Sequence, residues 1–198
     1  MKNYDRYRDT TSQQYDKKTF MSWFYCKSPD RKLFPLLSEI KDKKILEVGL
    51  GTGRYTKILM HNNDITGLDR NIHLCELPVK LYEGDATEIT RLVKDEKFDF
   101  VVSIWMTEYL NPQQLGLFFA ESKKTLRPGG KLITTVISPY GFGFLYITLA
   151  KKLRKIEKFN YNKMQIIEKL KQAGFANMEI IRLDSWLRMP WAYLAIAQ

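Results

Sequence analysis

Three glycines follow a short apolar segment and stand directly before a helical pattern. The residues read Lys44-Ile45-Leu46-Glu47-Val48-Gly49-Leu50-Gly51-Thr52-Gly53-Arg54. Glycines at such a place let the chain turn sharply and let a ligand approach backbone N–H groups at the start of a helix. A dinucleotide fingerprint needs glycine where Arg54 stands, and a phosphate-binding P-loop needs Gly-Lys-Ser/Thr. The glycines therefore predict a ligand site that is neither of these two.

An acidic side chain, Glu47, lies inside the apolar segment just before the glycines. Beside a pyrophosphate its negative charge would be repulsive, whereas beside a ligand that carries an ammonium and a sulfonium it is favourable. This contrast favours S-adenosylmethionine over a nucleotide phosphate as the ligand. In the alternative interpretation, Glu47 only hydrogen-bonds the backbone of a tight turn.

Two more acids follow the next two apolar segments. Asp69 ends Thr66-Gly67-Leu68, and Asp85 follows Glu83-Gly84. In a parallel sheet the carboxyl ends of neighbouring strands face one crevice, so a carboxylate at Asp69 can accept both ribose hydroxyls and Asp85 can accept from an adenine amine. An aspartate after a strand is by itself more often a helix N-cap. Three acids on consecutive strand ends behind a glycine loop nevertheless favour one shared site.

The elements that must position these acids alternate in type from Lys44 onwards. Short apolar segments alternate with helical stretches, which is typical of βαβ units and a parallel sheet. We predict strands at Ile45–Val48, Asp64–Leu68, Val79–Glu83, Phe98–Ile104, Lys131–Ile137, Met178–Leu183 and Trp191–Ala197.

Two helices are clear in the second half of the chain. One follows Pro112 and is predicted to end in turn chemistry at Arg127-Pro128-Gly129-Gly130; the other spans Asn162 to Ala173 and stops at Gly174. Only seven residues separate the last two predicted strands, too few for a helical crossover, so these strands must be antiparallel. The fold class predicted is α/β: a doubly wound, mostly parallel, seven-stranded sheet with an antiparallel last strand and helices on both faces.

The size of the chain indicates one domain. It has 198 residues, of which 44% are hydrophobic and 13% aromatic, enough for a single substantial core. Residues 1–43 are predicted to form an N-terminal helical cover and residues 138–161 a lid over the substrate. The first residues lack the apolar core of a secretory signal, so we expect a cytoplasmic protein. Two cysteines are too few for a disulfide framework or a cysteine-based metal site, and no metal site is predicted.

As a set, these motifs resemble the Rossmann-like (class I) S-adenosylmethionine-dependent methyltransferases, in particular the group that acts on small molecules and lipids. The similarity covers residues 44–137 well and 164–197 in pattern, and the matching motifs are Glu47–Gly53, Asp69, Gly84-Asp85-Ala86, Phe98–Ser103, Glu108-Tyr109-Leu110 and Leu126–Leu132. The resemblance implies that the glycines border the methionine part of the cofactor, Asp69 the ribose, and Asp85 with Ala86 the adenine. The cofactor-binding residues that it implies are Glu47, Gly49, Gly51, Gly53, Asp69, Arg70, Asp85, Ala86, Ser103 and Ile104.

The candidate catalytic residues follow the fourth strand. Glu108 and Tyr109 stand near the place where the family holds its methyl acceptor, and either can take a proton or orient a nucleophile. Packing at a helix start explains them equally well. The family usually has histidine at the position of Tyr109, so the resemblance assigns no acid–base role there. The same region reads Ser103-Ile104-Trp105-Met106 instead of an Asn-Pro-Pro-Tyr-like motif, which disfavours methylation of nucleobase amines.

The acceptor class depends on the segment from Tyr140 to Lys158. Its first half is apolar and aromatic, and its second half carries Lys151, Lys152, Arg154, Lys155 and Lys158. One interpretation is a lid over an apolar acceptor that also touches an anionic membrane. The other is a helix whose Phe144, Leu145, Ile147 and Leu149 pack on the sheet while the basic side chains are solvated.

The net charge of +10 leaves three function classes open. The first, which the resemblance favours, is a methyltransferase for a small or lipid-like acceptor, with possible peripheral contact to anionic membrane. The second is an RNA methyltransferase that uses the basic surface, a less favoured partner because no RNA-binding module is appended. The third is a protein that binds S-adenosylmethionine without transferring its methyl group.

Overall fold

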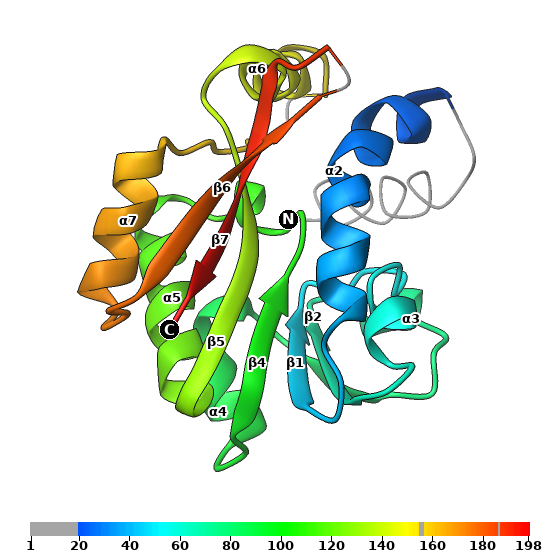
Figure 1. Ribbon diagram of the computed structural model, residues 1–198, viewed down its shortest axis with the longest axis vertical. Helices are drawn as coiled ribbons and strands as arrows, with labels where there is room; N and C mark the ends of the chain where they lie inside the picture. Colours follow the sequence, from blue (N-terminus) through cyan, green and yellow to red (C-terminus); the bar gives the residue numbers. More distant parts are fainter. Residues whose placement is uncertain (1–19, 155–156, 186) are drawn as a thin grey trace.

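Seven strands form one sheet at the centre of the molecule (Figure 1). The computed structural model describes residues 20–154, 157–185 and 187–198, with side chains from residue 29 onwards except at residues 150, 153 and 154. The strand order is β3-β2-β1-β4-β5-β7-β6. The strands are β1 (Lys44–Val48), β2 (Asp64–Asp69), β3 (Lys80–Glu83), β4 (Phe98–Ser103), β5 (Leu126–Ile137), β6 (Met178–Asp184) and β7 (Pro190–Ala197).

The pairing confirms the predicted fold class. The pairs among β3, β2, β1, β4 and β5 are parallel, whereas β7 is antiparallel to both β5 and β6. The two last strands therefore form the expected antiparallel pair, with β6 at the sheet edge. Each predicted strand is present, and most ends differ from the predicted ones by one residue or less.

Helices cover both faces of the sheet, as predicted. The helices are α2 (Phe20–Ser38), α3 (Thr56–Leu59), α4 (Ile89–Val93), α5 (Pro112–Thr125), α6 (Gly141–Arg154) and α7 (Lys163–Gln172), and the short turns are η1 (Ile72–Leu74), η2 (Ala86–Glu88) and η3 (Thr107–Tyr109). One apolar core joins the sheet to α4, α5 and α7, and the other joins it to α2, α3 and α6. Capping boxes begin both long helices of the first face, at Asn111 with Gln114 and at Asn162 with Gln165.

Two covered faces explain why the strands are continuous apolar segments. Successive side chains of a strand point to opposite faces, so both sets must be apolar when both faces are packed. Leu46 lies in the core of α4, α5 and α7, whereas its neighbour Ile45 lies in the core of α2, α3 and α6. Leu132 and Ile133 on β5 divide between the two cores in the same way.

The predicted turn at Arg127–Gly130 is wrong in one respect, because β5 already begins at Leu126. Leu126 pairs with Phe98 and Lys131 pairs with Phe100, so the segment between them bulges out opposite Asp99. The Asp99 carboxylate accepts a hydrogen bond of 2.9 Å from Arg127 Nη1. The turn chemistry read from the sequence therefore makes a bulge inside the strand rather than a loop before it.

Helix α6 lies beyond the carboxyl ends of β4 and β5, at the end of the molecule where the glycine loop also opens (Figure 1). It packs through Ile147 and through the Tyr146 ring, whose centroid lies 5.4 Å from that of Trp191 on β7. A side chain at Gly143 would come within 2.3 Å of the Ser138 carbonyl oxygen, so α6 approaches the backbone closely there. Helix α6 lies within the predicted lid at residues 138–161, whose role over a substrate stays a prediction. Of the predicted N-terminal cover, residues 1–19 lie outside the described chain.

Candidate functional site

The glycine loop connects β1 to α3. Gly49 and Gly53 have φ angles of +77° and +81°, in the left-handed region that favours glycine. A side chain at Gly49 would come within 2.4 Å of Met106 Cγ, and one at Gly53 within 2.5 Å of Leu77 Cδ1. The missing side chains therefore make room for Met106 and Leu77, which bring the segment after β4 and the segment before β3 against the loop.

Asp69, at the end of β2, holds the middle of the loop. Its Oδ2 atom accepts a hydrogen bond of 3.0 Å from the Gly51 N–H, and its Oδ1 atom accepts one of 2.9 Å from the Asn71 N–H. The side chain is 6% exposed. Two backbone donors fix the orientation of this carboxylate at the loop, where the sequence places the ribose contact.

Glu47 lies beneath the loop in β1, 2% exposed. Burial raises the pKa of its carboxyl to about 8; the hydrogen bond of 2.6 Å from the Thr56 hydroxyl opposes that shift, and the nearby Asp69 charge adds to it. The alternative interpretation limits Glu47 to hydrogen bonds with the turn backbone. In the structure its side chain instead accepts a hydrogen bond from the Thr56 hydroxyl. It holds a proton at neutral pH until a cationic group comes close.

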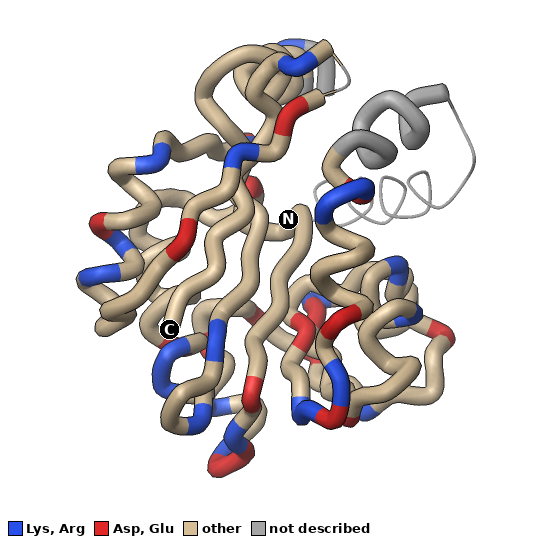
Figure 2. The backbone as a smooth tube through the Cα atoms, in the orientation of Figure 1, with Lys and Arg blue, Asp and Glu red and all other residues tan. Residues whose placement is uncertain are grey.

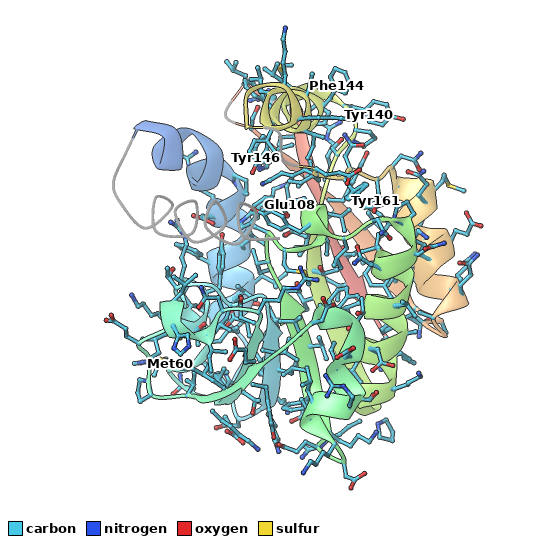
Figure 3. All side chains as sticks on the ribbon, turned by 180° about the vertical axis from the view of Figure 1, so that it is seen from behind. Met60, Glu108, Tyr140, Phe144, Tyr146 and Tyr161 are labelled. Carbon is cyan, nitrogen blue, oxygen red and sulfur yellow. The ribbon has the colours of Figure 1, made fainter. Side chains whose placement is uncertain are left out.

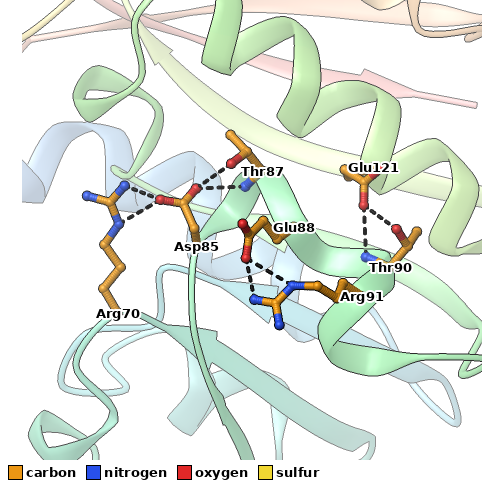
Figure 4. A network of polar contacts seen from close by, with 7 residues as sticks. All are labelled: Arg70, Asp85, Thr87, Glu88, Thr90, Arg91 and Glu121. Carbon is orange, nitrogen blue, oxygen red and sulfur yellow. Dashed lines mark hydrogen bonds and ion pairs between the residues drawn. The ribbon is translucent and has the colours of Figure 1, made fainter.

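Asp85, after β3, is engaged with protein partners (Figure 4). Its Oδ1 atom accepts from the Thr87 N–H at 2.9 Å and from the Thr87 hydroxyl at 2.8 Å. Its Oδ2 atom accepts from Arg70, with Nε at 2.9 Å. Burial opposes ionisation of Asp85, but these hydrogen bonds lower its pKa overall. The carboxylate caps η2, as an aspartate after a strand commonly does, and an adenine amine must replace one of these donors to bind there.

The remaining predicted cofactor residues fall into two groups. Ala86 lies in the core of α4, α5 and α7, and Ile104 lies in the core of α2, α3 and α6. Ser103, at the end of β4, is fully buried, and its hydroxyl has no hydrogen-bond partner within the described chain. A buried hydroxyl without a partner is uncommon and marks this strand end as a place for a further polar group.

A series of hydrogen bonds connects α2 to the loop, and no pattern in the sequence predicts it. Trp105 Nε1 donates to the Tyr55 hydroxyl at 2.7 Å, and that hydroxyl donates to Asp30 Oδ1 at 2.9 Å. Arg54 Nη2 lies 2.5 Å from Asp30 Oδ2. Trp105 has a φ angle of +58°, a strained conformation for a bulky residue, directly after β4. These contacts connect Arg54 and Tyr55, which follow the glycines, to α2 through Asp30 and to the segment after β4 through Trp105.

The two candidate catalytic residues lie in η3, close to Lys158. Glu108 is 4% exposed, and its Oε1 atom lies 3.6 Å from Lys158 Nζ. The same ammonium lies 4.4 Å from the centre of the Tyr109 ring, a cation–π contact. The sequence predicted Lys158 as part of a solvated or membrane-facing basic group, but it is 5% exposed. Its partner Glu108 is fifty residues away, which no local pattern reveals.

The exposure of α6 bears on the packing interpretation of this segment, whereas contact with a membrane stays a prediction. Ile147 is buried as the packing interpretation requires, but Phe144, Leu145 and Leu149 are 56%, 47% and 39% exposed. Figure 3 shows Tyr146 on the side of α6 towards Glu108, and Phe144 at the outer end of the molecule. Three of the four apolar residues thus form an outer face of the helix rather than a core.

The hydrogen-bond acceptors at the carboxyl edge of the sheet fit S-adenosylmethionine. Its ammonium, ribose hydroxyls and adenine amine are all hydrogen-bond donors, and carboxylates of Glu47, Asp69 and Asp85 stand at the ends of three adjacent strands. The two arginines nearest the loop, Arg54 and Arg70, are paired with Asp30 and Asp85. A phosphate-bearing cofactor would therefore meet more acceptors than donors here, whereas a cationic one is favoured.

Comparisons with known proteins agree with this geometry. A family model described as a methyltransferase domain matches residues 46–134, from the strand before the glycines to β5. The phthiotriol/phenolphthiotriol dimycocerosates methyltransferase 1 of Mycobacterium ulcerans is 31% identical over 153 residues, which cover 63% of this chain and 55% of that protein. The chain spans about half the length of the curated relatives it matches.

Solved structures share the fold. A protein of Pyrococcus horikoshii superposes with a TM-score of 0.65 at 21% identity, covering 93% of this chain and 92% of that one. An S-adenosylmethionine-dependent methyltransferase of Methanosarcina mazei superposes with a TM-score of 0.60 at 15% identity, covering 81% and 94%. Residues 46–134 thus match a methyltransferase-domain model, and the strand order is that of the Rossmann-like fold which these structures share.

Proposed function

We propose that the protein transfers the methyl group of S-adenosylmethionine to a small or lipid-like acceptor bound between the carboxyl edge of the sheet and α6. Methyl transfer is an in-line displacement at a sulfonium, so the protein contributes mainly position and, for a protonated nucleophile, a base. The cofactor supplies the electrophilic methyl group. Glu47, Asp69 and the glycine loop hold it, with Asp85 after an exchange of hydrogen-bond partners.

The observation that carries the acceptor class is the outer face of α6. Two further apolar side chains, Leu187 and Met189, are 50% and 41% exposed in the segment before Pro190, which lies against Gly141 at the start of α6. An apolar face of this kind on a substrate cover fits an acceptor that is itself apolar or is taken from a lipid surface. The relative from Mycobacterium ulcerans is named as a methyltransferase of phthiotriol and phenolphthiotriol dimycocerosates, which supports a lipid-like acceptor.

Basic residues beside that face support contact with an anionic membrane. Lys151 and Lys152 follow the exposed leucines of α6, and Arg188 stands between Leu187 and Met189; all three are exposed. Elsewhere in the described chain, Lys and Arg are distributed over several elements rather than gathered on one face, so a continuous RNA-binding surface is less favoured (Figure 2). None of the described helices combines the length and apolar character needed to cross a bilayer.

The test is transfer of label from S-adenosylmethionine that carries an isotope in its methyl group. The protein is incubated with it, below saturation, and with separated lipid, RNA and small-molecule fractions of cells; Asp69→Ala, with weakened cofactor binding, serves as the control and should transfer less label. We expect label in the lipid or small-molecule fraction. Label in RNA, falling steeply with added salt, would indicate the second function class instead. Binding of the cofactor without label in any fraction would indicate the third.

A further inference from the structure

Glu108 and Lys158 form a buried ion pair between η3 and the segment after α6. The Lys158 ammonium is enclosed by the Tyr109 ring at 4.4 Å and the Tyr146 ring at 4.5 Å, and it donates a hydrogen bond to the Tyr146 hydroxyl. Three parts of the chain therefore meet on one ammonium group: η3, α6 and the segment before α7. Figure 3 shows Glu108 at the carboxyl end of β4, beneath α6.

One carboxylate oxygen of Glu108 has no hydrogen-bond partner among the described residues. Lys158 faces Oε1, but Oε2 is fully buried and accepts no hydrogen bond within the described part of the chain. A carboxylate has about four acceptor positions, and leaving a charged oxygen unsatisfied in the interior is costly. The ammonium neutralises the charge of the pair without occupying Oε2. The pair is thus arranged to accept one more donor.

Glu108 lies in a turn that begins directly after a residue in contact with the glycine loop. Glu108 stands two residues after Met106, whose side chain fills the space above Gly49. The Phe159 N–H donates to the Glu108 carbonyl oxygen at 2.8 Å, and the Tyr109 N–H donates to the Met106 carbonyl oxygen at 3.0 Å. These backbone bonds hold η3 between the glycine loop and the segment that carries Lys158.

We propose that the acceptor is a hydroxyl compound, that its O–H donates to Glu108 Oε2, and that Glu108 is the general base of the transfer with Lys158 as its positioning residue. This inference rests on the proposed function. The acceptor oxygen forms a bond to the methyl carbon while the carbon–sulfur bond breaks, and the electron pair of that bond goes to sulfur. The hydroxyl proton moves to Oε2 of Glu108 and then to solvent.

The electrostatics around the pair make Glu108 a stronger base than an exposed carboxylate. Burial raises the pKa of the Glu108 carboxyl, and the positive charge of Lys158 opposes that shift. Among the described residues, the titratable groups that face the pair are Tyr109 from η3 and Tyr146 from α6. Removing the ammonium must therefore raise the pKa of Glu108 further, and the pH at which the base becomes active must rise with it.

The first test uses 4-octylphenol, a hydroxyl compound with an apolar tail, as the probe acceptor. Its hydroxyl is protonated at pH 7, so transfer needs a base. We expect Glu108→Gln to lower kcat by about 100-fold or more at pH 7 while S-adenosylhomocysteine affinity stays unchanged. The loss should shrink as the pH rises, because phenolate formed in solution replaces the base. Glu157→Gln, an exposed neighbour of Lys158, should keep full activity.

The second test follows the pH profile of kcat/KM and remains informative if Glu108→Gln does not fold. Lys158→Met should move the acid limb to higher pH, and Lys158→Arg should restore it, whereas the exposed Lys163→Met should leave it in place. A purely structural Lys158 would lower stability without moving the limb. An unmoved limb, or Glu108→Gln within threefold of wild type, overturns the inference.

Failure of the inference and failure of the proposed function give different results. If the protein methylates a cell lipid fraction but not 4-octylphenol or other hydroxyl probes, the function stands and the hydroxyl assignment is wrong. If S-adenosylhomocysteine does not bind, the proposed function fails. If the cofactor binds and no probe or cell fraction is methylated, both are wrong.

Discussion

Asp69 is the residue on which the cofactor site most depends. It accepts hydrogen bonds from the backbone N–H groups of Gly51 in the loop and of Asn71, so the carboxylate that we propose as the ribose contact also orders the loop. Hydrogen bonds to a charged group contribute about 1.5–3 kcal/mol. We expect Asp69→Ala to weaken S-adenosylhomocysteine binding about 10- to 100-fold, measured by calorimetry. Asp64→Ala, at the exposed start of the same strand, is the control and should bind as wild type does. Equal affinities for all three proteins would contradict the placement of the ribose.

Glu47 gives the cofactor-free protein a characteristic pH dependence. Its folded-state pKa of about 8 exceeds the value of about 4.3 in an unfolded chain, so the folded protein keeps a proton that the unfolded chain releases. This stabilising contribution is complete below about pH 4.3 and is lost as the pH rises towards 8.

We expect Glu47→Gln, which cannot ionise, to flatten the stability profile between pH 5 and pH 8 and to be more stable than wild type at pH 8. Urea unfolding at several pH values measures this difference. Glu179→Gln, on the exposed part of β6, should follow the wild-type profile. A slope that persists in Glu47→Gln would show that another group carries the proton.

The sequence predicted the acids and glycines of the site but not their supporting contacts. Glu47, Asp69 and Asp85 were recognisable because each stands at the end of an apolar strand of a parallel sheet. The burial of Lys158 could not be predicted in this way. A lysine is rarely buried without a charged partner, and its partner Glu108 is far away in the sequence. The hydrogen bonds that Arg70 and Thr87 donate to Asp85 likewise depend on the tertiary structure, so the sequence did not predict them.

At the scale of the elements, α2 is fixed to the glycine loop by one buried carboxylate. Burial raises the pKa of Asp30, while the Arg54 charge and the hydrogen bonds from Tyr55 and Arg54 oppose that shift. We expect Asp30→Ala to lower the free energy of unfolding by about 1.5–3 kcal/mol, the range for hydrogen bonds to a charged group. Hydrogen exchange should become faster in α2. Glu39→Ala, exposed just after the helix, is the matched control. A loss no greater than that of the control would show that apolar packing alone holds α2.

The sequence predicted the strands well for a physical reason. A sheet covered on both faces requires continuous apolar segments, and glycines and prolines separate these clearly. The Arg127–Gly130 bulge was read as a turn, because a bulge and a turn use the same residue types and differ only in whether the partner strand continues. The exposure of Phe144, Leu145 and Leu149 was also undecided, since a helical apolar pattern does not say which side faces the protein.

At the scale of the whole molecule, the apolar face of α6 and its basic neighbours predict binding to anionic vesicles. Each basic residue near such a surface contributes about 1 kcal/mol. Changing Lys151 and Lys152 to Gln should therefore weaken binding to phosphatidylserine vesicles about 30-fold in a sedimentation assay, with little effect on a soluble acceptor. Phe144→Ser with Leu145→Ser should reduce binding to anionic and neutral vesicles alike. The control is Lys163→Gln with Lys171→Gln on α7. An equal loss in that control, or no binding by wild type, would contradict membrane contact.

The central claim is that the carboxyl edge of this sheet is a site for S-adenosylmethionine, and titration calorimetry with S-adenosylhomocysteine tests it most directly. The acids at the ends of β1, β2 and β3 and the exclusion of a dinucleotide motif predict saturable binding at one site per chain, with no heat of binding for NAD⁺ under the same conditions. Absence of saturable S-adenosylhomocysteine binding by the folded wild-type protein, or tighter binding of NAD⁺, would contradict the account.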